Sequence, residues 1–253
     1  MEGRSMKPRI SLVIPAWNEA RRLPGSLVEL SRYMEQQIPG AVEVLVVVEP
    51  CGDGTLEIAK AHAQNHAGFR VLEGAVHRGK GSAVRRGMLE AAGEFVFYMD
   101  ADLSVPLREV DAFLEVFGAE PGVSLLLGNR AHARSRITRR QSVVRRNMGR
   151  VFNGLLGLLG LASVHDTQCG FKAFRREAAL EIFSLQQLDG FAFDVEVLVL
   201  AEALGIRALD LPVEWINSPD SRVSIVGDSL RMIVDSVRVR GLVAQRLRER
   251  NRP

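Results

Sequence analysis

The sequence predicts an α/β fold in which a mostly parallel central sheet carries helices on both faces. Three observations lead to this prediction. Short apolar runs rich in β-branched residues alternate along the chain with segments of helical periodicity. Glycines and polar residues follow these runs, as they do where a strand turns toward a helix. The 253 residues, 47% of them hydrophobic, are enough to bury one sizeable core.

Five apolar runs account for the predicted strands. The first, ISLVI, stops at Pro15, and the second, VEVLVVV, stops at the turn-rich PCGDG. The third, RVLEG, is shorter, and EFVFYMD and VSLLLGNR follow later in the chain. In order along the chain, the predicted strands are 10–14, 42–48, 70–74, 94–100 and 123–130.

Helical spacing of apolar residues appears after each of the first three predicted strands. It covers 23–34, then 55–65, where Thr55 is a candidate N-cap, and then a segment that ends near residue 92. The last helix begins after the glycine-punctuated loop HRGKGS. A strand followed by a helix and another strand is the unit from which parallel sheets are built, so these helices are expected to cover the sheet.

Polar and acidic residues gather where four of the predicted strands end. The segments are PAWNE (15–19), EPCGD (49–53), DAD (100–102) and GNR (128–130). Strand ends often need Asn, Asp and Gly for turns alone, so one such segment would mean little. Because parallel strands end at one edge of the sheet, where ligands bind, the four together predict a site there.

The positive charge of the chain is local. The segment 130–150 holds eight arginines and no acidic residue, whereas the whole chain has a net charge of only +3. A basic patch of this kind either binds an anionic partner or forms a solvated face. Its arginines are not interleaved with aromatic side chains, so nucleic acid is not an expected partner.

Asp100 and Asp102 follow a buried strand and are separated by one small residue, Ala101. Two carboxylates with this spacing suit Mg²⁺ or Mn²⁺, which prefer hard oxygen ligands and often carry a diphosphate. The alternative is a turn with two solvated aspartates. The position after a strand of the predicted sheet favours the metal site.

Several motifs resemble glycosyltransferase family 2, which has the GT-A fold. Within that family the sequence is most similar to the polyprenyl-phosphate glycosyltransferases, of the dolichyl-phosphate glucosyltransferase and mannose synthase types. The resemblance covers about residues 9–225. It rests on VIPAWNE (13–19), GKGSAVRRGM (79–88), DADLSVP (100–106), GNR (128–130), DTQCGFKAFRREAA (166–179), FAFDVEVL (191–198) and SRVS (221–224).

The resemblance implies a nucleotide-sugar site on the first half of the chain. The residues that it implies there are Pro15, Ala16, Asn18, Glu19, Glu49, Asp53, Lys80, Asp100, Ala101 and Asp102. Asp102 is implied as the principal metal ligand, with Asp100 and Ser104 beside it. The chain departs from the family at 49–53, where EPCGD replaces the usual DDGSxD turn, and Lys80 could instead be a solvated lysine at the start of a helix.

The resemblance also implies a phosphate-bearing acceptor. The expected acceptor-phosphate residues are Arg130, Arg145, Arg146, Asp166, Gln168 and Lys172. Arg222 is expected to contact the diphosphate, and Asp194 to position the sugar or an arginine, so the expected catalytic residues are Asp102, Asp194, Arg130 and Arg222. A lipid phosphate is already ionised at neutral pH, so no general base is needed. The remaining arginines of 130–150 could form a solvated face.

Membrane contact is expected to be peripheral. No run reaches the ~20 apolar residues of a membrane span, and no signal peptide is evident. The uncharged stretch 151–164 is either a core helix or an interfacial segment, and the basic tail after 235 either lies on an anionic bilayer or packs as a solvated helix. The two cysteines fit a reducing compartment, so the expected location is the cytoplasmic face of a membrane.

Together these features predict a metal-dependent inverting enzyme that moves a hexose from a nucleotide sugar to a polyprenyl (dolichyl-type) phosphate. UDP-glucose is the favoured donor and GDP-mannose the alternative. A family 2 enzyme with a soluble acceptor is the second hypothesis. The expected organisation is a flexible N-terminus (1–8), a GT-A catalytic domain (9–230) and a basic C-terminal helix or tail (231–253).

Overall fold

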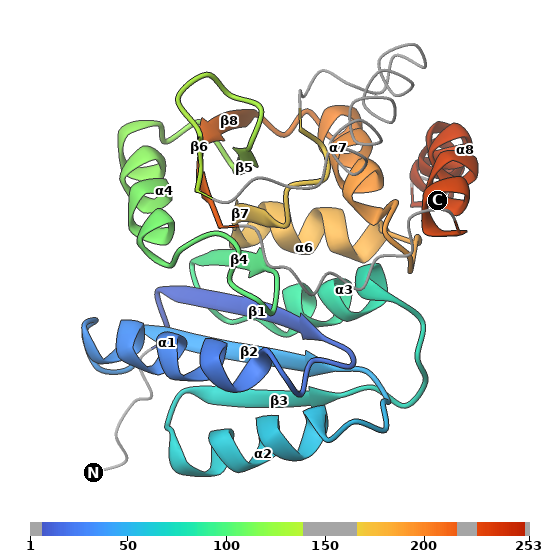
Figure 1. Ribbon diagram of the computed structural model, residues 1–253. Helices are drawn as coiled ribbons and strands as arrows, with labels where there is room; N and C mark the ends of the chain where they lie inside the picture. Colours follow the sequence, from blue (N-terminus) through green and yellow to red (C-terminus); the bar gives the residue numbers. More distant parts are fainter. Residues whose placement is uncertain (1–6, 139–165, 217–226, 251–253) are drawn as a thin grey trace, which may run out of the picture.

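A computed structural model describes residues 7–138, 166–216 and 227–250. Its centre is a sheet of seven strands in the order β3-β2-β1-β4-β7-β5-β8 (Figure 1). The strands are β1 (Ile10–Ala16), β2 (Val42–Val48), β3 (Phe69–Glu73), β4 (Phe95–Met99), β5 (Leu125–Asn129), β7 (Phe171–Arg175) and β8 (Ala208–Pro212). All five predicted strands are therefore confirmed, with bounds that differ by at most two residues.

The sheet is mostly parallel, as predicted. The pairs β1–β2, β1–β4, β2–β3 and β5–β8 are parallel, whereas β7 is antiparallel to both of its neighbours, β4 and β5. Because β7 runs the other way, β4 and β5 point in the same direction. The carboxyl ends of β1, β2, β4 and β5 thus meet at one edge, and the amino-terminal end of β7 lies among them.

Helices cover both faces of the sheet. The structure describes α1 (Leu23–Glu35), α2 (Thr55–Asn65), α3 (Lys80–Glu90), α4 (Arg108–Ala119), α6 (Arg176–Leu185), α7 (Phe193–Ala203) and α8 (Gly227–Arg250). Helices α1, α2 and α4 pack on one face with Leu27, Ala59 and Phe113. Helices α3, α6, α7 and α8 contribute to a second core on the other face.

The alternation of side chains along β1 explains why there are two cores. Leu12 and Ile14 belong to the first core and Val13 to the second, and all three are fully buried. Successive side chains of a strand point to opposite faces, so a strand buried on both sides has no polar face. The unbroken apolar runs in the sequence follow from this arrangement.

A second, two-stranded sheet lies beside β5. Its strands, β6 (Arg136–Ile137) and β9 (Glu214–Trp215), pair in parallel. The backbone N–H of Ile216 donates to the carbonyl of Ser104 at 2.7 Å. This small sheet therefore connects the segment after β5 to the loop that leaves β4.

Helix α8 packs on α7 and α6 rather than standing apart (Figure 1). Val239 and Val243, one turn apart, are buried in the second core. The expected boundary between residues 230 and 231 falls inside this helix. No helix within the described ranges is both long and apolar enough to span a bilayer, and the stretch 151–164 lies outside those ranges.

The start of α2 differs from the prediction. Thr55 is the first helical residue, and Gly54, with φ 91°, precedes it as the N-cap. The Asp53 carboxylate accepts hydrogen bonds from the Thr55 N–H at 3.1 Å and the Thr55 hydroxyl at 2.6 Å. A side-chain acceptor does bind a free N–H group at the start of the helix, but Asp53 supplies it and not Thr55. The Thr55 hydroxyl instead donates to Asp53 and accepts from the Glu19 N–H.

Candidate active site

The turn that follows β4 carries the two aspartates of the DAD motif. Its backbone closes with a hydrogen bond from the Leu103 N–H to the Asp100 carbonyl at 3.0 Å. Leu103 has φ 47°, a left-handed conformation that costs a residue with a branched side chain about 1–2 kcal/mol. Burial of Leu103 against the first core holds the turn in this shape. Strain of this kind is typical of functional sites.

Asp102 is held on both of its carboxylate oxygens. Oδ1 accepts from the Ser104 N–H at 3.1 Å and the Ser104 hydroxyl at 2.7 Å, and Oδ2 receives Nη1 of Arg22 at 3.0 Å. Burial, and then the charge of Asp100, raise the pKa of Asp102, although Ser104 and Arg22 act in the opposite direction. Ser104, expected as a metal ligand, is buried and donates its hydroxyl to Asp102, so it orients that carboxylate.

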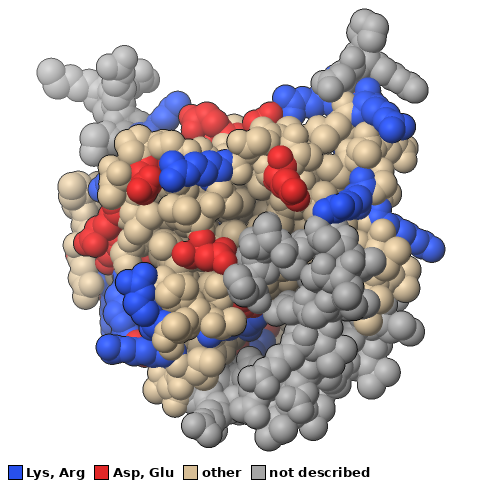
Figure 2. Space-filling view, turned by 90° about the horizontal axis from the view of Figure 1, so that it is seen from above, with Lys and Arg blue, Asp and Glu red and all other residues tan. Residues whose placement is uncertain are grey.

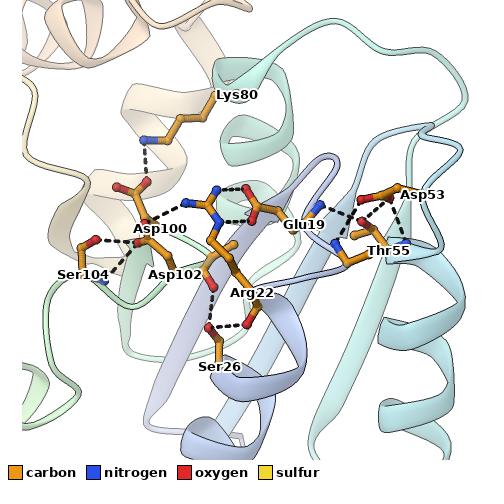
Figure 3. A network of polar contacts seen from close by, with 11 residues as sticks. Glu19, Arg22, Ser26, Asp53, Thr55, Lys80, Asp100, Asp102 and Ser104 are labelled. Carbon is orange, nitrogen blue, oxygen red and sulfur yellow. Dashed lines mark hydrogen bonds and ion pairs between the residues drawn. The ribbon is translucent and has the colours of Figure 1, made fainter. Parts of the chain in front are cut away.

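Asp100 receives the ammonium group of Lys80, with Nζ 2.7 Å from Oδ1 (Figure 3). Burial opposes the charge on Lys80, but the nearby Asp100 and Asp194 outweigh it and raise the pKa of the lysine. Lys80 is the first residue of α3, so the GKG loop brings it to this edge. A Cβ on Gly81 would lie 2.3 Å from the Leu188 carbonyl oxygen, so this loop requires glycine.

The loop after β1 places the predicted donor residues beside this turn. Ala16 ends β1, and its carbonyl accepts from the Glu49 N–H at 3.1 Å. Asn18 has φ 55°, a conformation that asparagine tolerates better than most residues. The buried Glu19 carboxylate binds the Arg22 guanidinium through Nε at 2.7 Å and through Nη2. Pro15, in β1, is partly exposed.

Asp53 ties this loop to α2. Its carboxylate accepts from the Ala20 N–H at 3.1 Å in addition to the two groups of Thr55, and these hydrogen bonds lower its pKa against the opposing effect of burial. The Thr55 hydroxyl in turn accepts from the Glu19 N–H at 2.8 Å. Figure 3 shows this chain of contacts from Asp53 to Asp102 along the sheet edge.

Glu49, expected in a loop that contacts the base, binds the segment before α3 in this structure. Its side chain is 6% exposed and accepts hydrogen bonds from the backbone N–H groups of Arg78 and Gly79 at 3.0–3.2 Å. Nδ1 of His77 lies 2.5 Å from the same carboxylate, and the His77 ring stacks on Trp17 at 4.2 Å. Glu49 therefore secures the loop before α3, where a negative charge suits the helix N-terminus.

Arg130, which is partly exposed, and the buried Asp166 form an ion pair on the other side of the site. Nε and Nη2 of Arg130 lie 2.7 Å from the two carboxylate oxygens of Asp166, which also accepts from the Arg130 N–H at 2.8 Å. Burial would raise the pKa of Asp166, but the charge and hydrogen bonds of Arg130 lower it. The guanidinium stacks over Trp215 at 4.7 Å.

Lys172 is fully buried, and its ammonium group is already satisfied. Nζ donates to the carbonyls of Thr167 at 3.1 Å and Cys169 at 2.8 Å and to Asp194 Oδ1 at 2.5 Å. The Tyr98 hydroxyl donates to the same oxygen of Asp194. These contacts use all three Lys172 donors, so in this structure the lysine fixes the 166–172 loop. Its contact with an acceptor phosphate stays a prediction.

The 166–172 loop lies directly against the DAD turn. A Cβ on Gly170 would lie 2.1 Å from Oδ2 of Asp100, so only glycine permits this approach. Nε2 of Gln168 is buried without a hydrogen-bond partner in the described part of the chain. An unpaired buried amide is costly and is commonly found where a ligand supplies the partner. The 166–172 loop and Lys80 thus both approach Asp100.

Three predicted residues, Arg145, Arg146 and Arg222, lie outside the described ranges. Across 7–138, 166–216 and 227–250, no group of three or more His, Cys, Asp or Glu side chains is arranged to hold a metal ion. A metal here would need ligands from a diphosphate or water in addition to the two aspartates.

Two residues that contact the predicted site, Arg22 and Tyr98, belong to no site predicted from the sequence. Arg22 precedes the first residue of α1, at the helix end that disfavours a positive charge, and this unusual position was a usable signal. Tyr98 lies inside an apolar strand, and nothing in the sequence distinguishes it from its aromatic neighbours. The pairing of β4 with β7 places Tyr98 opposite Lys172, and both side chains bond the same oxygen of Asp194.

The fold and the site define a glycosyltransferase, and the chain belongs to glycosyl transferase family 2. Residues 11–183 match the sequence model of that family. The dolichyl-phosphate beta-glucosyltransferase of Drosophila melanogaster is 34% identical over 233 residues, which cover 88% of this chain and 72% of the relative. The enzymes of the same name from Saccharomyces cerevisiae and Homo sapiens are each 31% identical and cover 91% and 92% of this chain, and 74% and 75% of their own lengths.

Solved structures support the GT-A fold. The chain is similar to glucosyl-3-phosphoglycerate synthase from Mycobacterium tuberculosis in complex with Mn²⁺, UDP and phosphoglyceric acid, with a TM-score of 0.69 and 20% identity. The similarity covers 93% of this chain and 78% of that one. A second structure of the same enzyme, with Mg²⁺ and UDP, has a TM-score of 0.65.

Proposed function

We propose that this protein is a metal-dependent inverting glucosyltransferase that moves glucose from UDP-glucose to a polyprenyl (dolichyl-type) phosphate. The observation that carries the proposal is its likeness to dolichyl-phosphate beta-glucosyltransferases over about nine-tenths of the chain. UDP-glucose carries its sugar in α linkage, so a β product requires inversion at the anomeric carbon. The contact between the 166–172 loop and Asp100 supports a single site for both substrates.

The donor is expected at the carboxyl edge of β1, β2 and β4. The loop from Pro15 to Glu19 would contact the nucleoside, and Lys80 would approach the diphosphate. The contact of Lys80 Nζ with Asp100 at 2.7 Å supports this proposal, because it keeps the ammonium group at this edge. In this proposal Glu49 holds the 77–79 loop in place, because its carboxylate accepts hydrogen bonds from the backbone N–H groups of Arg78 and Gly79.

A divalent metal ion, Mg²⁺ or Mn²⁺, fits the donor set. The available groups are carboxylate oxygens of Asp102 and Asp100, which are hard ligands of the kind that both ions prefer. When bound, such an ion neutralises negative charge on the departing nucleoside diphosphate. Ser104 would contribute through Asp102, whose Oδ1 it holds at 2.7 Å.

The reaction requires positioning more than proton transfer. A phosphate oxygen of the acceptor attacks the anomeric carbon, and the bond from that carbon to the diphosphate oxygen breaks. Because the phosphate is already ionised, no base has to remove a proton. Asp194 is buried and bonded to Lys172 and Tyr98, so its proposed role is to fix the 166–172 loop against the sugar site.

The acceptor phosphate would be bound by arginine. Arg130 is oriented by Asp166 and by the ring of Trp215, which leaves one guanidinium nitrogen, Nη1, without a hydrogen bond to that carboxylate. Guanidinium groups suit phosphate oxygens. Gln168 would add a hydrogen bond from Nε2, and Arg145, Arg146 and Arg222 remain proposed contributors.

We also propose that the protein works at a membrane surface, on its cytoplasmic face. Both cysteines are free thiols, as a reducing compartment would keep them. Helix α8 carries exposed arginines and the exposed Val234 and Val237. In Figure 2, Lys and Arg side chains project from the right-hand side of the molecule, where Figure 1 places α8. This combination of basic and apolar side chains suits an anionic bilayer.

A transfer assay tests the proposed reaction. The protein is incubated with Mn²⁺ or Mg²⁺, a short polyprenyl phosphate and one radiolabelled donor at a time: UDP-glucose, GDP-mannose or UDP-N-acetylglucosamine. We expect label to enter the organic phase with UDP-glucose. We expect Asp102→Ala to lose about 10²-fold or more of the rate, as other removals of transition-state charge stabilisation do.

The matched control is Asp111→Ala, which removes an exposed aspartate of α4 that bonds Tyr33 away from the site. This variant should keep the wild-type rate. Label that enters lipid only from GDP-mannose would replace glucose by mannose in the proposal. Label that enters only a water-soluble phosphate acceptor would overturn the lipid acceptor.

A further inference from the structure

We propose that Arg22 is an internal cation of the metal site: it occupies Asp102 in the donor-free protein and thereby weakens the binding of a divalent metal until the diphosphate arrives. This inference rests on the metal dependence of the proposed function. It adds a positioning residue that acts through Asp102.

The contacts of Arg22 are those of a built-in counterion. Nη1 lies 3.0 Å from Oδ2 of Asp102, and Nε lies 2.7 Å from Oε2 of Glu19, whose other oxygen receives Nη2. The three side chains are 10–17% exposed. Arg22 therefore bridges two carboxylates with a fork that matches their geometry, and little water competes with it.

The position of Arg22 is fixed by its surroundings. Its backbone N–H donates to the Glu19 carbonyl at 3.0 Å, and one turn into α1 the Ser26 hydroxyl donates to the Ala101 carbonyl at 2.6 Å. The start of α1 is thus fastened to the DAD turn itself (Figure 3). The guanidinium is held beside Asp102 and does not have to be drawn in from solvent.

The charges of the cluster explain its effect on a metal. Within the described ranges, the ion pairs of this cluster join three carboxylates (Glu19, Asp100 and Asp102) to two cations (Arg22 and Lys80). These five groups together carry one net negative charge, and without Arg22 they would carry two. A dication is repelled by a guanidinium on the same carboxylate, whereas a diphosphate adds the negative charge that restores its affinity.

The test is the affinity of the donor-free protein for Mn²⁺, measured by electron paramagnetic resonance of the free ion. Arg22→Gln removes the charge and keeps an amide that can still bond a carboxylate. We expect the Kd for Mn²⁺ to fall about tenfold in this variant, in line with the loss of a unit charge at a partly buried site. Added UDP should improve Mn²⁺ binding less in Arg22→Gln than in the wild type.

Two further variants separate charge from structure. Arg22→Lys keeps the charge and should bind Mn²⁺ within about twofold of the wild type, since the Coulomb repulsion remains. Arg246→Gln removes an arginine that pairs with Glu249 on the exposed surface of α8 and should change nothing. An affinity in Arg22→Gln that equals or falls below the wild-type value would overturn the inference. A gain in Arg22→Lys as large as in Arg22→Gln would also overturn it.

If Arg22→Gln does not fold, the wild-type protein still provides a test. The Nη resonances of the Arg22 guanidinium in a ¹⁵N-labelled sample should shift on titration with Mg²⁺, because the metal competes for Asp102, which Nη1 contacts. Unchanged Nη resonances at saturating Mg²⁺ would refute the inference. These measurements need neither sugar nor acceptor. A failed transfer assay with a confirmed Mn²⁺ result would therefore reject the proposed reaction and leave the role of Arg22 in place.

Discussion

At the scale of single residues, charged side chains of the site come in pairs. Arg22 holds Asp102, Lys80 holds Asp100, Arg130 holds Asp166 and Lys172 holds Asp194. Each pair joins segments that are distant in sequence. A buried charge without its partner is strongly unfavourable, so each pair constrains where its two segments can lie.

The Arg130–Asp166 pair makes a prediction about stability and pH. Asp166→Asn leaves Arg130, whose side chain is 23% exposed, without its counterion and should lower the free energy of unfolding at pH 7 by about 2 kcal/mol, the scale of hydrogen bonds to charged groups. The pKa of Asp166 in the folded protein lies below the ordinary value of 3.8. The stabilisation is therefore complete above that value and is lost as the pH falls through the lower, folded pKa.

Urea unfolding of the wild type and Asp166→Asn at pH 7, at pH 5 and below the ordinary aspartate pKa measures this difference. We expect the same gap at the two higher pH values and a smaller one at the lowest. Glu214→Gln is the control, since it breaks an ion pair with the largely exposed Arg108 and should cost less than about 1 kcal/mol. A gap that stays constant into the acid range would contradict the assignment.

Residue roles were only partly predictable from the sequence. Asp100, Asp102, Lys80, Arg130 and Asp166 were identified, and the structure brings them to one edge of the sheet. Lys172 was expected at the acceptor phosphate, but its contacts with Asp194 and two carbonyls could not be predicted, because a motif shows which residue is present and not which neighbours satisfy it. Arg22 was missed because its partner Asp102 is eighty positions away.

At the scale of elements, local patterns predicted more than pairing did. The five predicted strands and three predicted helices all form, because their apolar periodicity is read within a few residues. Strand β7 was not predicted. Its pairing with β4 and β5 is long-range and antiparallel, and no local periodicity shows it. Yet β7 brings the 166–172 loop to the site.

The close approach of the β7 loop to the β4 turn gives a prediction about Gly170. A methyl group there would lie 2.1 Å from Oδ2 and 2.5 Å from Cγ of Asp100, so the carboxylate or the loop must move. Gly170→Ala should lower the rate of sugar transfer by about 10²-fold, the scale expected for a displacement of about 1 Å at a reacting centre. The rate is measured with saturating donor and acceptor.

Gly118→Ala is the matched control for this variant. It adds the same methyl group to α4, where nothing lies within 4 Å, and should leave the rate unchanged. Circular dichroism should show that both variants fold. A Gly170→Ala protein that transfers sugar at the wild-type rate would mean that the position of Asp100 is not critical.

At the scale of the whole molecule, the active edge of the sheet and the basic helix α8 belong to one compact body. Helix α8 packs on α7, and α7 carries Asp194. The surface proposed to meet the membrane is therefore connected to the site through a single layer of helices. An acceptor with a lipid tail needs such an arrangement, because its phosphate must reach the site while its tail stays in the bilayer.

Vesicle binding tests this arrangement. The protein should sediment with vesicles that contain about 30% phosphatidylserine at low salt and should be released by about 0.5 M NaCl, because screening weakens surface attraction. The double variant Arg238→Gln/Arg248→Gln removes two exposed charges from α8. It should bind up to about thirtyfold more weakly, since each of the two basic residues contributes about 1 kcal/mol.

The control removes two charges from α1 and α2 instead, with Arg32→Gln/Lys60→Gln. These helices lie away from α8 in Figure 1, so binding should be unchanged. Equal loss of binding in both double variants would assign the effect to net charge and not to α8. Sedimentation with neutral vesicles alone would contradict the proposed contact.

The pairing of β4 with β7 has an evolutionary consequence. Tyr98 lies opposite Lys172 and Met99 opposite Phe171, and the next residues along each strand, Asp100 and Gly170, are in contact. A substitution on one strand changes the space or the charge available to the other. We therefore expect residues 98–102 and 168–172 to covary among homologues and to be inherited as one unit. A chimaera that takes only one of the two segments from a homologue would combine side chains that did not evolve in contact with each other.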